Sequence, residues 1–224
     1  MKHSVHFEAC RQNMVESQIR TGGVVHPGIL EAFRQVPREL FVHLGQTGIA
    51  YGDEDLPLAE GRCLMEPLTH ARLLSFALPV SGDTALVVGG ATGYAGAILS
   101  PLVSSVISVE CFAEWTDNAR QLWSDLGYQN IVAHTGDLVW GCPDKAPYSL
   151  IFINGGVSHV PQSLLDQLSV GGRLVAVVND NPGVMMGQGR IIYRTSEDNF
   201  SERGLFDAAV PCLREFAPRR EFAF

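Results

Sequence analysis

The stretch TALVVGGATGY, residues 84–94, indicates the fold class of this chain of 224 residues. Its first part, residues 84–88, is a short, mostly apolar run, as expected for a strand buried on both faces of a sheet. Three glycines follow within residues 89–93, so the backbone can turn tightly and approach a ligand there. A helix is expected next, and the first N–H groups of a helix are unpaired. A strand, a glycine-rich turn and a helix in this order are typical of a doubly wound α/β fold.

Short apolar runs that alternate with helical stretches continue after this unit. Further strands are expected at 106–109, 131–133, 149–153 and 174–178, and helices at 93–100, 112–126 and 160–168. Strands that are apolar on both faces and alternate with helices predict a parallel sheet covered on both sides. The last part differs, because two extended stretches, 189–195 and 205–210, flank turn residues at 197–199. We therefore predict a doubly wound, mostly parallel sheet with an antiparallel C-terminal hairpin.

The residues before this unit have a different character. Apolar residues recur at helical spacing over 8–20, a second helix is expected over 27–35, and Pro67 begins a third that ends near Leu78. Residues 45–66 are rich in glycine, acids and proline and lack periodicity, which predicts a long irregular segment. We expect residues 1–79 to form a helical cap packed on a core of residues 80–224, together making one compact domain. The glycines of 45–66 would suit either a lid or a static loop.

Composition excludes several classes of protein. Hydrophobic residues make up 46% and charged residues 18%, which excludes a disordered chain. The net charge of −8 argues against a basic surface for nucleic acid. Five scattered cysteines without a CxxC pair indicate reduced thiols in the cytoplasm, and histidines without ligand spacing predict no metal site. No apolar stretch is long enough to predict a membrane span.

Acidic residues follow the next two expected strands. Glu110 ends the second strand, VISVE, and Asp137 follows Gly136 after the third. A carboxylate at the end of the second strand is where such folds bind a ribose diol. Each acid alone can equally be a loop charge or a helix cap, but together with the turn they indicate a cofactor that carries a nucleoside. NAD and S-adenosylmethionine both fit, and the departure of the turn from GxGxxG, the third-strand acid and the terminal hairpin favour S-adenosylmethionine.

Over nearly its whole length the sequence resembles the protein-L-isoaspartate O-methyltransferases. The matching segments are RQNMVESQIR at 11–20, FRQVPRELFV at 33–42, AY at 50–51, LPL at 56–58, GD at 136–137, APY at 146–148, residues 168–174 and the tail from Arg194 to Phe206. The resemblance implies a Rossmann-like sheet of seven strands and an S-adenosylmethionine-binding core. It places the cofactor-binding residues at Gly89, Gly90, Gly93, Glu110 and Asp137.

The chain departs from the family's pattern at several positions. The family's substrate loop usually reads G-x-T-I-S-x-P, whereas residues 61–67 are GRCLMEP. Cys63 and Met65 thus stand at the implied catalytic positions of the threonine and the serine. Arg62 is interpreted either as a partner for the acceptor carboxylate or as an exposed loop arginine. Asn154, which begins NGG where the family has Thr-Ala-Ala, is the second implied substrate-binding residue.

The cofactor turn departs as well, because Val87 replaces the usual acid and Ala91 the middle glycine. The resemblance implies an enzyme that methylates the free carboxylate of L-isoaspartyl residues in damaged proteins or peptides. The departures leave an alternative: a weak or inactive S-adenosylmethionine-binding relative, or a methyltransferase with another carboxylate or a small molecule as acceptor. We expect a cytoplasmic monomer that binds neither nucleic acid nor membrane.

Overall fold

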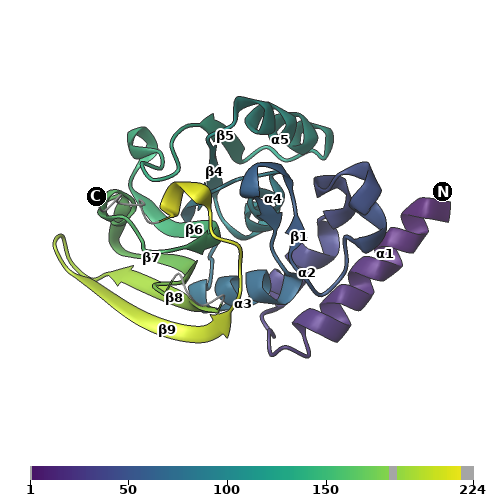
Figure 1. Cartoon of the computed structure of the whole chain (residues 1–224), viewed down its shortest axis with the longest axis horizontal. Helices are drawn as coiled ribbons and strands as arrows, with labels where there is room; N and C mark the ends of the chain where they lie inside the picture. Colours follow the sequence, from purple (N-terminus) through teal and green to yellow (C-terminus); the bar gives the residue numbers. More distant parts are fainter. Residues whose placement is uncertain (1, 182–185, 218–224) are drawn as a thin grey trace, which may run out of the picture.

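The computed structural model describes residues 2–181 and 186–217, and its centre is a sheet of seven strands (Figure 1). The strand order is β5-β4-β3-β6-β7-β8-β9. The strands are β3 (Thr84–Val88), β4 (Ser105–Glu110), β5 (Ile131–Thr135), β6 (Tyr148–Val157), β7 (Leu168–Val178), β8 (Gly187–Arg194) and β9 (Phe200–Ala208). Strands β3 to β7 pair in parallel, while β8 and β9 add antiparallel pairs. This confirms the predicted doubly wound, mostly parallel sheet with an antiparallel end.

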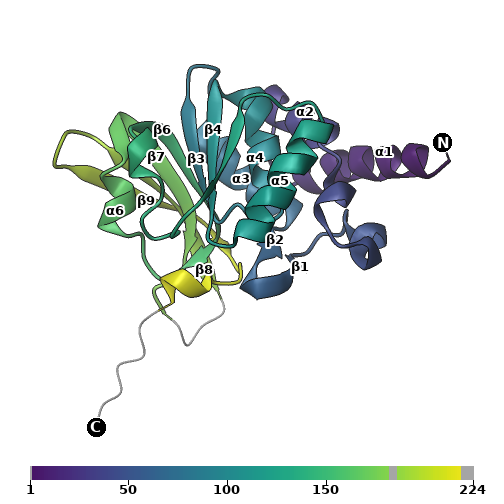
Figure 2. The same cartoon turned by 90° about the horizontal axis from the view of Figure 1, so that it is seen from above.

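Alternate residues of the central strands bury two separate hydrophobic clusters, one on each face. On one face Val87 and Val106 pack with four helices, and on the other Leu86 and Val109 pack with a short helix and the C-terminal turn. The helices of the first face are α2 (Pro27–Gln35), α3 (Pro67–Ala77), α4 (Tyr94–Leu99) and α5 (Ala113–Asp125), and the elements of the second are α6 (Gln162–Leu165) and the 3-10 turn Arg214–Phe216. Seen from above, the sheet separates α6 from the other helices (Figure 2).

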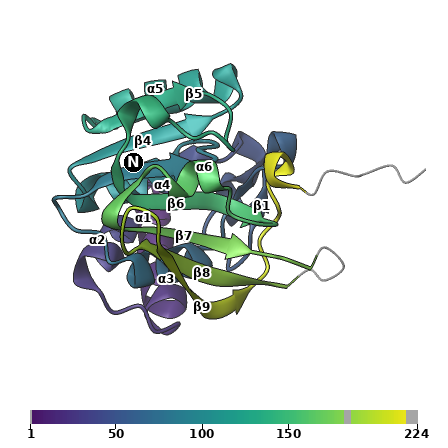
Figure 3. The same cartoon turned by 90° about the vertical axis from the view of Figure 1, so that its left-hand side faces the viewer.

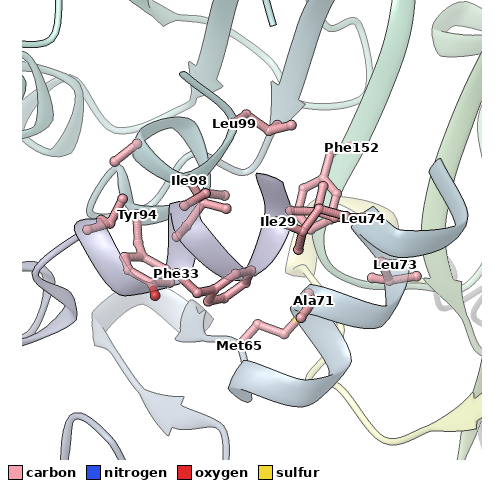
Figure 4. Close-up of a cluster of buried hydrophobic side chains, with 14 of the residues drawn as sticks. Ile29, Phe33, Met65, Ala71, Leu73, Leu74, Tyr94, Ile98, Leu99 and Phe152 are labelled. Atoms are coloured by element: carbon pink, nitrogen blue, oxygen red, sulfur yellow. The ribbon is translucent and has the colours of Figure 1, made fainter. Parts of the chain in front are cut away.

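The cap, residues 2–79, shares its hydrophobic cluster with the sheet. Ile29 and Phe33 of α2 and Leu74 of α3 lie against Ile98 of α4 and Phe152 of β6 (Figure 4). Both helices begin at a proline, whose fixed φ suits the first helical position. Among residues 2–181 and 186–217, no helix is both long and apolar enough to cross a bilayer.

The first helix differs from the expected 8–20. Helix α1 runs over Lys2–Met14, and a π-helical turn, Val15–Ile19, continues it. Val15 and Ile19 are completely buried, so packing on the cap interior accompanies the change of helical type.

Two other predictions are corrected. The segment 45–66 is more regular than expected, because 3-10 turns cover Leu44–Ile49 and Ala59–Gly61 and a small antiparallel sheet pairs β1 (Leu56–Pro57) with β2 (Cys63–Leu64). The helix expected at 160–168 is a single turn, α6, because β7 begins at Leu168, where it pairs with Tyr148. The C-terminal turn lies beyond the carboxyl ends of β6 and β7 (Figure 3).

Candidate functional site

The glycine-rich turn, residues 89–93, joins β3 to α4 at the carboxyl edge of the sheet. The strand order reverses here, between β3 and β6, which is where doubly wound folds bind ligands. Gly89 and Gly93 have φ of +79° and +95°, which side chains other than glycine's strain to adopt. A Cβ on Gly90 would collide with Oγ of Ser108 in β4. The turn therefore lies tightly against β4 and depends on its glycines.

Glu110 lies beside this turn at the end of β4. Its carboxylate accepts hydrogen bonds from the backbone N–H groups of Ala91, at 3.0 Å, and Cys111, at 2.8 Å. Asp137 lies exposed on the loop after β5, and its carboxylate accepts a bond from Val139 N–H at 2.8 Å. The structure thus brings Glu110 onto the turn as predicted, while the Asp137 side chain caps its own loop.

Arg62 reaches Glu110 from the loop between β1 and β2. Its Nε and Nη2 donate to the Glu110 carboxylate at 3.0 and 2.8 Å. Its Nη1 and Nη2 also donate to Glu215, at 3.1 and 2.9 Å. Arg62 is only 2% exposed. The interpretation of Arg62 as an exposed loop arginine is therefore wrong, because two carboxylates of the chain itself hold it inside.

The three groups shift one another's pKa. Burial alone would raise the pKa of Glu110, but the bonds from Arg62 and from the two backbone N–H groups outweigh burial and lower it. Burial likewise opposes the charge of Arg62, and the two carboxylates outweigh it and raise the pKa of Arg62. Burial and then Glu215 and Glu110 raise the pKa of the adjacent Cys111 thiol to about 12. The cluster therefore holds an ionised arginine, ionised carboxylates and an unreactive thiol at neutral pH.

Residues 211–216, here called the closing segment, cover the same edge of the sheet (Figure 1). Gly156 N–H donates to the Pro211 carbonyl at 2.9 Å, and Leu213 N–H donates to the Gly156 carbonyl at 2.8 Å. These bonds direct the Leu213 side chain between β3 and β6. A Cβ on Gly89 would lie 3.1 Å from a Leu213 methyl, and one on Gly155 would lie 2.7 Å from Leu213 Cγ. Leu213 therefore fills the crevice at the switch point.

The predicted residues are of the chemical types that bind a nucleoside cofactor. The turn offers glycine backbone at the switch point, and Glu110 offers a carboxylate at the position that binds a ribose diol. In this conformation, however, Arg62 holds that carboxylate and Leu213 takes the crevice. The fit therefore requires these two side chains to move.

Asn154 supports the turn from β6. Its side-chain amide donates to the Gly89 carbonyl at 2.9 Å, and the residue is 8% exposed. The structure thus places this predicted substrate-binding residue underneath the cofactor turn.

Cys63 and Met65 lie inside the cap. Met65 is 1% exposed and belongs to the cluster of hydrophobic side chains shown in Figure 4. Cys63, in β2, is 6% exposed, and burial raises the pKa of its thiol to about 12. Neither position offers the hydroxyl that a threonine or serine would provide.

A cavity of about 620 Å³ opens beside the charged cluster of Arg62, Glu110 and Glu215, between the cap and the N-terminal half of α5. Its lining includes Phe41, Thr92, Cys111, Phe112 and Trp115. Neither this cavity nor the participation of Leu213 and Glu215 follows from the sequence patterns. Pro211 is the one local signal near the closing segment, and it indicates only that a helix does not continue there.

Two solved structures share this Rossmann-like fold. One protein-L-isoaspartate O-methyltransferase matches with a TM-score of 0.79 at 24% identity, covering 90% of this chain and 65% of that one. A Plasmodium falciparum protein described as a candidate protein-L-isoaspartate O-methyltransferase, in complex with S-adenosyl-L-homocysteine, matches with a TM-score of 0.77 at 17% identity, covering 92% and 98%.

Sequence relatives identify the family. Protein-L-isoaspartate O-methyltransferase 2 of Pelobacter propionicus is 41% identical over 168 residues, 75% of each chain. The protein-L-isoaspartate O-methyltransferase of Syntrophus aciditrophicus is 37% identical over 173 residues, 77% of this chain and 79% of that one. The family model for protein-L-isoaspartate(D-aspartate) O-methyltransferase matches residues 9–199. The chain belongs to this family, which confirms the expected family and its S-adenosylmethionine-dependent methyltransferase class.

Proposed function

We propose that this protein methylates the free carboxylate of L-isoaspartyl residues in damaged proteins, with S-adenosylmethionine as the methyl donor. The observation that carries the proposal is Glu110, held by backbone N–H groups of the glycine-rich turn at the end of β4. The family match over residues 9–199 supports the substrate class.

The cofactor would supply a methyl group activated by a sulfonium. Glu110 would bind the ribose diol, and the turn that contains Gly89, Gly90 and Gly93 would lie against the cofactor, with Asp137 on the neighbouring loop. Asn154 keeps this turn in place through its bond to the Gly89 carbonyl. The protein's part in the reaction is to bind, align and exclude water, which are large contributions when two reactants must meet.

The acceptor needs no general base. A free carboxylate is already ionised near neutral pH, so no proton has to be removed before attack. It does need a positive group to orient it, and Arg62 is buried at the site with a fork of N–H donors that matches a carboxylate. Its two present partners are both carboxylates, which supports a role in holding the acceptor.

The test is the transfer of a labelled methyl group to an isoaspartyl peptide and to its normal aspartyl twin. The expected result is label in the isoaspartyl peptide alone. Equal labelling of both would refute the specificity. Absence of label in both, with S-adenosyl-L-homocysteine shown to bind by calorimetry, would refute the proposed reaction.

A second candidate is a relative that binds the cofactor but transfers methyl groups weakly, or to another carboxylate or small molecule. Its support is the burial of Met65, because the family's serine position offers no hydrogen bond here. One lost bond to a charged group costs about 1.5–3 kcal/mol, which corresponds to roughly tenfold to a hundredfold in rate. The peptide assay distinguishes the candidates, because the second predicts cofactor binding with little or no labelling.

The proposal includes the setting in which the enzyme works. It treats residues 1–79 and 80–224 as a cap and a cofactor-binding core of one domain, in a cytoplasmic monomer that takes protein or peptide substrates. The five free cysteines support a reducing compartment. The net charge of −8 supports substrates other than nucleic acid.

A further inference from the structure

We propose that the closing segment, residues 211–216, is a built-in competitor of the cofactor. Leu213 blocks the crevice between β3 and β6, and Glu215 holds Arg62 on Glu110, so the cofactor binds only when the segment moves away. This inference rests on the proposed function, because it takes S-adenosylmethionine as the ligand of that crevice.

The Glu110 carboxylate has no hydrogen-bonding capacity left for a ribose in this conformation. A carboxylate has about four lone-pair sites for hydrogen bonds. One oxygen accepts from Arg62 Nε and Ala91 N–H, and the other accepts from Arg62 Nη2 and Cys111 N–H. These bonds use the sites that a ribose diol would need. A nucleoside therefore has to displace Arg62, because the two backbone donors are fixed in the turn and the strand.

The space at the switch point is also occupied. Gly89 and Gly155, which have no side chains, line the crevice on its two sides. The Leu213 side chain lies against both of them. Leu213 is 2% exposed, so it is packed there and not merely nearby. Leu213 therefore occupies the space at the Gly89 end of the glycine-rich turn, whereas Thr92, nearer its other end, lines the cavity.

The closing segment is held by contacts that can be exchanged. Its backbone is tied to β6 by the bonds between Gly156 and residues 211 and 213. The Glu215 side chain is 23% exposed, and the exposed Arg214 lies 3.7 Å from Glu60. Segments with few bonds and partial exposure open locally at less cost than the global unfolding of a protein. Phe216, 1% exposed, would anchor the end of the segment.

Displacement would also change what Arg62 can bind. In the closed conformation Glu215 gives Arg62 a carboxylate from the chain itself. When the segment leaves and a ribose engages Glu110, the guanidinium loses both partners and is free for the carboxylate of an acceptor. Glu215 thus stands where an acceptor carboxylate would be bound, and one movement opens both the cofactor and the acceptor positions.

The test is calorimetric titration of the full chain with S-adenosyl-L-homocysteine. The variants are Leu213→Ala, which empties the crevice, and Glu215→Gln, which removes one of the two charges that hold Arg62 and does not shorten the side chain. We expect each to bind at least about fivefold more tightly than the wild type, the lower end of usual coupling between competing states. Arg214→Gln is the matched control in the same segment, because the pair of Arg214 with Glu60 is largely exposed and holds the segment little, so its affinity should equal that of the wild type. Circular dichroism melts verify that each variant is folded.

Hydrogen exchange gives a second readout that needs no turnover. The amide of Leu213, bonded to Gly156 in the closed conformation, should lose protection in the wild type at saturating S-adenosyl-L-homocysteine. Equal affinity of the wild type and both variants, unchanged protection on saturation, or no binding by any of the proteins would each overturn the inference.

The outcomes separate this inference from the proposed function. Variants that bind more tightly but label neither peptide would support the closing segment and refute the methylation of isoaspartyl residues. A wild type that labels the isoaspartyl peptide, with the same cofactor affinity as both variants, would support the methylation of isoaspartyl residues and overturn the inference about the closing segment.

Discussion

Arg38 and Arg62 are both buried arginines of the cap, but their partners differ in kind. Arg38 is completely buried and donates to two backbone carbonyls, from Nε to Ala50 at 2.6 Å and from Nη2 to Met65 at 2.9 Å. Its guanidinium lies 5.0 Å from the ring centre of Tyr94. Arg62 donates to two carboxylates, one at the end of β4 and one in the closing segment.

The difference shows that the partners decide what a buried arginine does. The carbonyls of Ala50 and Met65 belong to backbone that cannot leave Arg38 without opening the cap. The Glu215 carboxylate stands on a separate segment, so Arg62 can exchange it for another anion. Arg38 therefore has a structural role, whereas Arg62, in the proposed function, can exchange Glu215 for the carboxylate of an acceptor.

The largest expected effect in this comparison comes from Arg38→Ala. The change leaves a cavity and two buried carbonyls without donors, so the free energy of unfolding should fall by about 3–5 kcal/mol. Urea denaturation at pH 7 measures it. Arg20→Ala is the control, because Arg20 is 56% exposed and its pair with Glu16 contributes little. A loss below about 1 kcal/mol for Arg38→Ala would contradict the structural role, since one unsatisfied buried carbonyl alone costs that much.

A second prediction concerns His70, which lies among Phe33, Tyr94 and Phe152 near Arg38. Burial and then the positive charge of Arg38 lower the pKa of His70 to about 3. The unfolded chain takes up this proton below about pH 6.5, but the folded chain does so only near pH 3. Stability is therefore lost as the pH falls through this window, by about 3 kcal/mol at pH 4 from this residue.

His70→Phe should remove that part of the acid sensitivity. Nε2 of His70 has no hydrogen-bond partner within the described part of the chain, so a phenyl ring loses no bond there. Urea unfolding of both proteins at pH 7 and pH 4 gives the comparison. His43→Gln is the control, because it replaces an exposed histidine outside this aromatic cluster. An unchanged loss of stability in His70→Phe would show that His70 takes up its proton in the folded state.

The smallest expected effect on stability comes from Glu215→Gln. Arg62 keeps both of its bonds to Glu110, and Glu215 is partly exposed, so the free energy of unfolding should fall by about 1 kcal/mol or less. The urea midpoint measures this change. If the free energy of unfolding fell as much as in Arg38→Ala, Glu215 would have a structural role, and the contrast between the two arginines would not hold.

The sheet was predictable because each central strand carries its own signal. The apolar run at 84–88 coincides with β3, and the proline at 27 marks the start of α2. Local chemistry suffices there, since a buried parallel strand and a proline at the first helical position need no distant partner to be recognised. The position of Glu110 beside the turn follows from the same strand order.

The closed site was not predictable from these patterns. Arg62 lies 48 positions from Glu110 and 153 from Glu215 along the chain, and no local signal joins them. Met65 departs from a motif in the sequence, yet in the structure it is core, because α3 begins at Pro67 and turns the loop's end inward. Helix α6 is shorter than the expected 160–168 for a similar reason, since the pairing of Leu168 with Tyr148 overrides the helical pattern.

The position of the closing segment in the chain also sets the order in which the site is completed during synthesis. A ribosome adds roughly 5–20 residues per second, so the 153 positions between Arg62 and Glu215 take roughly 8–30 s. Glu110 follows 48 positions after Arg62, so for the remaining 105 positions the two residues exist without the carboxylate and the leucine that later cover them. If the closing segment competes with the cofactor as proposed, the nascent chain contains Arg62 and Glu110 before it contains their competitor.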